Sequence, residues 1–117
     1  MAITGNYIFT ASMDVDPDKE DLFNEVYDTE HMPNLLKVAG VVATTRVINQ
    51  NFSVNMAGEV KEVVLSDEPK YTAIHEVESP DVLTSQAWAD AIEDGRWPAQ
   101  VRPYTSNRRH TFKKVMG

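Results

Sequence analysis

Four stretches of the chain have the β-rich or alternating composition that is typical of strands. Residues 7–15 alternate between a polar face and a more apolar face that carries Tyr7, Phe9, Ala11 and Met13. Residues 41–48 are dense in valine and threonine, and residues 70–77 form a third stretch of this kind. Residues 101–115 are long, polar and contain several arginines, and they predict a last strand.

Two helices are predicted between these strands. Asp16-Pro17 supplies a side-chain acceptor for free amides and a proline that needs no donor, which is a common way for a helix to begin. Ser79-Pro80 repeats this start, and Gly95 is expected to end the second helix. Each helix has an apolar stripe, formed by Leu22, Phe23, Val26 and Tyr27 in the first and by Leu83, Ala87, Trp88, Ala91 and Ile92 in the second.

Two segments are less regular. Because Pro33 disfavours helix in the residue before it, we expect a break or kink near His31 and Met32, followed by a short helical turn over 33–38. Residues 49–69 contain a break at Gly58 and a candidate strand over 59–65. Since an unstructured loop of about 20 residues is unusual in a small domain, part of this segment should be ordered, at a sheet edge or a subunit contact.

The order of elements is β-α-β, an insert, and again β-α-β, over a single domain of residues 1–117. Two such halves predict an α+β, ferredoxin-like βαββαβ fold, in which an antiparallel sheet has both helices on one face. An apolar face on the other side of the sheet would need a partner. Face-to-face packing of two sheets in a homodimer provides one.

Composition narrows the function classes. The 117 residues include 11 Lys and Arg against 18 Asp and Glu, and the net charge of −7 argues against a general nucleic-acid or anionic-membrane role. The absence of cysteine excludes disulfides, thiol nucleophiles and cysteine-based metal sites. No apolar run approaches the ~20 residues that span a bilayer. Residues 1–6 lack the features of an export signal, so we expect a cytoplasmic protein.

No cofactor and no metal site are predicted. His31, His75 and His110 come from three different elements, so a three-histidine site would require the fold to bring them together. A histidine is available as an axial haem ligand, but there is no haem attachment motif. A glycine-rich phosphate loop and a G-x-S-x-G elbow are also absent from the sequence.

The segment YDTEHMPNLLKVAGV, residues 27–41, resembles the Y-x-x-E-H-x-P-x-L-L-x-V-x-G signature of EthD-like proteins in the dimeric α+β barrel superfamily. Residues 71–78, with Pro80, Leu83, Ser85 and Trp88, are similar to the second half of that family, and Trp97-Pro98 and residues 101–105 fit as well. The resemblance covers most of the chain outside residues 49–69.

The resemblance implies a ferredoxin-like fold, a homodimer whose sheets form a shared barrel, and a pocket between each sheet and its helices. Relatives in the superfamily include cofactor-free monooxygenases, polyketide cyclases, muconolactone isomerases and haem enzymes. EthD itself resembles an accessory component of an ether-degradation system. Membership of such a family implies a fold but not a reaction.

His31 is the strongest candidate for catalysis. A helix break at Pro33 would let its ring point into the crevice between sheet and helices. Imidazole exchanges a proton near neutral pH, which suits a general acid or base for an enolisable substrate. The alternative is that His31 only caps the broken helix and packs against the sheet.

Three further residues are candidate substrate contacts besides Tyr27. His75 shares a strand face with Tyr71, which lies either in the pocket or at the dimer sheet. Trp88 is either an apolar wall for a substrate ring or ordinary core. Arg102 either binds a substrate carboxylate or serves solubility or the subunit contact.

Tyr104 is a second candidate catalytic residue, because Tyr104 or Arg102 would stabilise an enolate oxygen where negative charge develops. The remaining basic residues carry the same ambiguity as Arg102, namely Arg46, Arg108, Arg109 and His110.

These observations predict a small cofactor-independent enzyme of catabolism that acts on a hydrophobic or aromatic small molecule. The expected chemistry is proton transfer of an isomerase, cyclase or lyase type, with His31 as general acid or base. The alternatives are a non-catalytic accessory or ligand-binding protein of a degradation pathway, and a cofactor-free monooxygenase.

Overall fold

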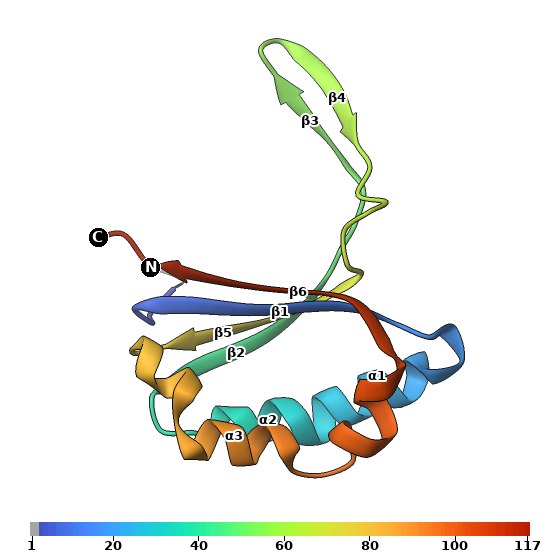
Figure 1. The fold of residues 1–117 in the computed structure, drawn as a ribbon. Coiled ribbons are helices and arrows are strands. Elements are labelled where there is room, and N and C mark those ends of the chain that lie inside the picture. Colours follow the sequence, from blue (N-terminus) through green and yellow to red (C-terminus); the bar gives the residue numbers. More distant parts are fainter. Residues whose placement is uncertain (1–2) are drawn as a thin grey trace.

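The computed structural model describes residues 3–117. The export-signal prediction concerned residues 1–6, and its first two residues lie outside the described range. Strands β1 (Tyr7–Val15), β2 (Val41–Ile48), β5 (Tyr71–Val77) and β6 (Thr105–Lys114) form an antiparallel sheet in the order β2-β5-β1-β6. Helices α1 (Glu20–Val26), α2 (Met32–Leu36) and α3 (Gln86–Glu93) cover one face of this sheet (Figure 1). The predicted α+β, ferredoxin-like fold is therefore confirmed.

Of the break or kink predicted near His31 and Met32, the break does not occur, and the irregularity is a π-helical turn within a continuous helix. A π-helical turn, Tyr27–His31, joins α1 directly to α2, and both His31 and Met32 have right-handed helical dihedral angles. The Met32 amide donates to the Tyr27 carbonyl five residues earlier. Pro33 then occupies the first turn of α2. The extra residue of the turn, and not a break, sets the direction of His31.

Two predicted boundaries also change. Residues 101–104 are helical rather than extended, because a π-helical turn (Trp97–Val101) and a 3-10 turn (Arg102–Tyr104) precede β6. Pro98 and Pro103 cannot donate to a strand ladder, which disfavours an earlier start of the strand. The second predicted helix is divided into a 3-10 turn (Pro80–Thr84) and α3, whose N-cap Ser85 accepts a bond from the Trp88 amide.

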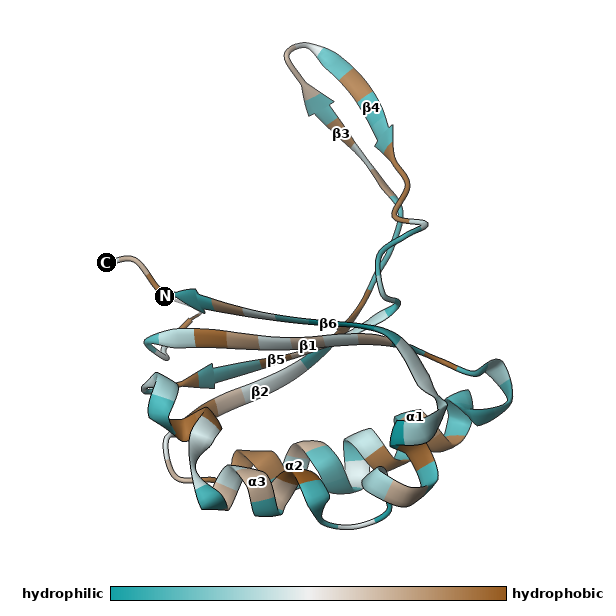
Figure 2. Ribbon diagram, viewed as in Figure 1, coloured by the Kyte–Doolittle hydropathy of each residue, from teal (hydrophilic) through white to brown (hydrophobic). Residues whose placement is uncertain are grey.

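The core lies between the sheet and the helices and consists of two clusters of buried side chains. One is built around Phe23 and Trp97, and the other around Leu35 and Trp88. Hydrophobic residues recur along β1, whereas β6 at the sheet edge is mostly hydrophilic (Figure 2). None of the helices in residues 3–117 is long and apolar enough to cross a membrane.

Part of the 49–69 segment is ordered, as expected, and forms a two-stranded hairpin of β3 (Phe52–Met56) and β4 (Glu59–Val63). Ala57 and Gly58 join the strands, and both have positive φ, of 53° and 84°, which a tight two-residue hairpin turn requires. The hairpin stands away from the sheet on the side opposite the helices (Figure 1). Strand β4 was predicted from the sequence, and its partner β3 was not.

Candidate functional site

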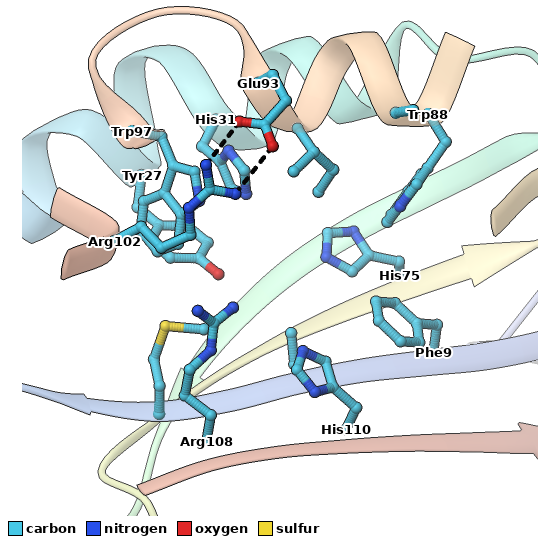
Figure 3. A pocket seen from close by; sticks show the side chains of 14 residues that line it. Phe9, Tyr27, His31, His75, Trp88, Glu93, Trp97, Arg102, Arg108 and His110 are labelled. Carbon is cyan, nitrogen blue, oxygen red and sulfur yellow. Dashed lines mark hydrogen bonds and ion pairs between the residues drawn. The ribbon is translucent and has the colours of Figure 1, made fainter. Parts of the chain in front are cut away.

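A cavity of about 400 Å³ lies between the helix-covered face of the sheet and the helices. Seven elements supply its walls: β1, β5, β6, α3, the π-helical turns Tyr27–His31 and Trp97–Val101, and the 3-10 turn Arg102–Tyr104 (Figure 3). Of the residues singled out in the sequence, it brings together Tyr27, His31, His75, Trp88 and Arg102. A volume of this size suits a small organic ligand, since about 150 Å³ already holds a benzene molecule.

His31 is held in the cavity wall by aromatic neighbours. Its ring stacks on Trp97, with ring centroids 4.6 Å apart, and meets the edge of Tyr27 at 5.1 Å. Only 4% of the residue is exposed. Its Nδ1 atom has no hydrogen-bond partner among the described residues, so no protein group at that atom fixes which ring nitrogen carries the proton. His31 packs against the core, and it also lines the cavity.

His75 faces the helices and lines the same cavity, which decides between the two positions considered for it. Its ring lies 5.9 Å from Phe9 and 5.5 Å from Trp88, measured between centroids. The residue is 1% exposed, and its Nδ1 is likewise without a partner in the described part of the chain. Buried polar atoms are usually satisfied, so two orphaned imidazole nitrogens beside one cavity need an explanation.

Burial keeps both imidazoles neutral. Loss of hydration lowers the pKa of His31 and of His75 to about 4, and the charges of Arg102 and Arg108 lower the His31 pKa further. Burial also raises the pKa of Tyr27 to about 12. At neutral pH the cavity therefore holds two neutral imidazoles, which can accept a proton, and an undissociated phenol, whose hydroxyl points into the cavity (Figure 3).

Two arginines line the cavity, and they differ in whether their charge is paired. Arg102 forms a two-pronged ion pair with Glu93 of α3, at Nη1–Oε1 and Nη2–Oε2 distances of 3.1 and 2.6 Å. Arg108, on β6, has no ion-pair partner among residues 3–117. The carboxylate-binding role predicted for Arg102 thus falls on a side chain whose charge is already paired.

His110 is the third histidine of the cavity and stacks on Phe9, with centroids 5.8 Å apart. The fold therefore does bring His31, His75 and His110 to one cavity. No group of three His, Asp or Glu side chains within residues 3–117 is placed to hold a metal ion, however. The two buried histidines are available for a ligand or a proton.

Tyr104 lies outside the cavity. Its residue is 37% exposed, the ammonium of Lys19 lies 4.6 Å from the centre of its ring, and its carbonyl accepts a bond from the Asp16 amide. The 3-10 turn that precedes β6 directs Tyr104 toward the start of α1. The structure does not bring this predicted catalytic residue to the site.

Arg108 and His110 were not chosen from the sequence, although a signal for them exists. His110 pairs with Ala11 and Phe112 with Phe9, so alternation places the even-numbered residues of β6 on the helix side of the sheet. To apply this alternation, one must know how the residues of β6 pair with those of β1. That register cannot be predicted from the sequence. Trp97 was noted only as part of the family resemblance.

Comparison with known proteins shows relatives at the level of fold. No protein-family model and no curated protein matches the chain. An EthD family protein from Bacillus halodurans superposes with a TM-score of 0.57 at 12% identity, over 94% of this chain and 99% of that one. A candidate antibiotic biosynthesis monooxygenase from Bacillus cereus gives 0.55 at 14% identity, over 97% and 94%. The predicted resemblance is confirmed for the fold.

Proposed function

We propose that the protein is a small cofactor-independent enzyme that acts on a hydrophobic or aromatic small molecule by proton transfer. His31 is its general acid–base, and the reaction is of an isomerase, cyclase or lyase type. The observation that carries this proposal is the pair of neutral, buried imidazoles, His31 and His75, whose Nδ1 atoms have no protein partner beside an aromatic cavity. A neutral imidazole is the form that accepts a proton.

Each step of the chemistry has a residue in the cavity. His31 removes a proton from the carbon beside a substrate carbonyl, and the electron pair moves onto the carbonyl oxygen to form an enolate. The Tyr27 hydroxyl donates a hydrogen bond to that oxygen, which replaces the role expected of Tyr104. His31 then returns the proton to a different carbon, or to a leaving group, and the enolate collapses. Proton and charge balance at every step.

The fold of the neighbours supports a second candidate of the same general kind. One neighbour is described as a candidate antibiotic biosynthesis monooxygenase. In a cofactor-free monooxygenase the same base would deprotonate a phenol and make its ring reactive toward oxygen. The aromatic walls formed by Phe9, Trp88 and Trp97 suit such a ring. Oxygen uptake with 1-naphthol would identify this chemistry, and its absence would favour isomerisation.

Exchange of enolisable protons tests the proposed function. The probe is 2-tetralone in D₂O, and the loss of its α-proton signals is followed by NMR. We expect the wild-type protein to accelerate exchange, and His31→Gln to slow it by about 10²–10⁴-fold, the usual contribution of a general base. Tyr27→Phe should slow it less. Arg109→Gln, on the opposite face of β6, is the matched control and should exchange like wild type.

The outcome separates the enzyme from the accessory-protein alternative. Binding of 2-tetralone without exchange above the buffer rate, equal in wild type and His31→Gln, would indicate a protein that only holds its ligand. Exchange that does not depend on His31 would refute its role as the base.

A further inference from the structure

One basic side chain in the cavity wall lacks the partner that all other arginines have. Arg108 makes no ion pair with any residue of the described chain, 3–117. Every other arginine is paired with a carboxylate: Arg46 with Asp28, Arg96 with Glu25 and Glu30, Arg102 with Glu93, and Arg109 with Glu68. Arg108 is exposed, so its guanidinium is open to a ligand as well as to water.

The cavity offers Arg108 no acid of its own. Glu93 is the only acidic residue that lines the described cavity, and both of its carboxylate oxygens are bonded to Arg102. The histidines there are neutral at neutral pH. Arg108 is an exposed residue, and its unpaired guanidinium borders an otherwise apolar and aromatic space, where it is free to bind an anionic group of a ligand.

The backbone of β6 contains a β-bulge beside Arg108. Between the pairs Ser12–Arg109 and Asp14–Ser106, strand β1 advances two residues while β6 advances three, which is a β-bulge. Asn107 takes a positive φ of 49° in the bulge, and its side-chain amide donates to Asp14 Oδ2 at 3.0 Å. Bulges bend a strand and redirect its side chains, often beside functional sites. Here Arg108 enters the cavity (Figure 3). Arg109 pairs instead with Glu68, which does not line the cavity.

The charge of Arg108 acts on the groups that the proposed function uses. Its charge adds to the burial that lowers the pKa of His31 and of His110, and it partly opposes the burial that raises the pKa of Tyr27. The guanidinium is therefore within electrostatic reach of the proposed base. An anion bound beside Arg108 would offset this charge and shift the His31 pKa upward, which makes His31 a stronger base once the ligand is in place.

We propose that the ligand of this cavity is a planar aromatic acid, whose carboxylate binds Arg108 and whose ring lies among Phe9, Trp88 and Trp97. The planar guanidinium matches a carboxylate with two parallel hydrogen bonds, and the aromatic walls stack on a ring. This inference rests on the proposed function in one respect, since it names the substrate class of the same cavity. It makes Arg108, and not Arg102, the residue that recognises the acid.

Calorimetric titration with a matched pair of probes tests the proposal. 2-Naphthoate and 2-naphthamide share one ring system, and only the first carries a charge. We expect wild type to bind the acid at least about tenfold more tightly than the amide, because hydrogen bonds to charged groups contribute this much or more. Arg108→Gln should abolish the preference and leave amide binding within twofold. Arg109→Gln, its neighbour on the other face, should keep the preference.

Arg108→Lys guards against a folding artefact, because it keeps the charge but loses the fork, and it should retain part of the preference. The proposal is overturned if wild type binds both probes equally, binds neither, or keeps its preference for the acid in Arg108→Gln. Failure here is distinguishable from failure of the proposed function. The exchange assay uses a neutral ketone and depends on His31, whereas this titration involves no reaction and depends on Arg108.

Discussion

Burial of His31 and His75 costs free energy of folding, and a functional role would explain why these residues are kept. A residue that is 4% exposed and another that is 1% exposed have given up hydration at ring nitrogens that the described chain does not replace with hydrogen bonds. Phenylalanine or leucine would fill the same space without this loss. A ligand or a transferred proton that meets these nitrogens accounts for their presence.

The same burial predicts how stability depends on pH. The pKa of each imidazole is about 4 in the folded chain and near 6.5 when unfolded, so the unfolded chain binds more protons between these values. The free energy of unfolding is therefore highest above pH 6.5, and it falls as the pH decreases toward 4. We expect urea unfolding to give a free energy at pH 5 that is lower than at pH 7.5 by about 2 kcal/mol for each imidazole.

The double variant His31→Phe/His75→Phe should lose most of this pH dependence, because it has no buried imidazole left to protonate. His110→Gln, which alters the more exposed histidine, should retain it. A double variant that loses as much stability as wild type between pH 7.5 and pH 5 would show that other groups cause the effect.

At the scale of elements, the site depends on how the turn after α3 meets the π-helical turn. Glu30, on the π-helical turn, accepts bonds from the amide and the guanidinium of Arg96, and these bonds lower the Glu30 pKa. Gly95 precedes Arg96 with a φ of 73°. A Cβ atom there would collide with the end of the Glu30 side chain, so Glu30 would have to move away from Arg96, and the positive φ itself favours glycine.

Gly95→Ala is therefore expected to destabilise the protein more than a glycine replacement without such a neighbour. Gly58→Ala is the matched control, because Gly58 also has positive φ but nothing lies within 4 Å of an added Cβ. The control should lose about 1–2 kcal/mol for the left-handed conformation alone. Gly95→Ala should lose at least about 1 kcal/mol more, as Glu30 has to leave Arg96. Equal melting temperatures for the two variants would contradict this interpretation.

The sequence predicts the elements of this fold better than the connections between them. The four sheet strands were found because strand composition and alternation are local properties. His31 lines the cavity, as expected, although the helix continues through a π-helical turn and does not break at Pro33. A π-helical turn has no sequence signal that separates it from a broken helix. Tyr104 was misplaced because two prolines and a 3-10 turn move it off the strand. Arg108 was left undecided because its direction depends on a bulge and a long-range register.

At the scale of the whole molecule, no helix within residues 3–117 packs on one face of the sheet, and the hairpin stands away from that sheet (Figure 1). Alternation places Ile8, Ile74 and Val47 on the face opposite the helices. On the hairpin, Phe52 and Met56 lie on the same face of β3 and are each 49% exposed. An isolated two-stranded hairpin is at best marginally stable in water. The hairpin extends on the side of the sheet opposite the helices, the side of the open sheet face (Figure 1).

We propose a homodimer that covers these two surfaces together, with the open sheet faces packed against each other and each hairpin against the partner. Light scattering after size-exclusion chromatography should give twice the chain mass of 13.2 kDa. Phe52→Ser/Met56→Ser should weaken association and increase the monomer fraction on dilution, because it removes apolar contact from the hairpin. Ser53→Ala/Asn55→Ala, on the other face of β3, is the control and should remain dimeric. A wild-type monomer at micromolar concentration, with the hairpin still ordered by NMR, would refute the dimer and require the hairpin to be stable alone.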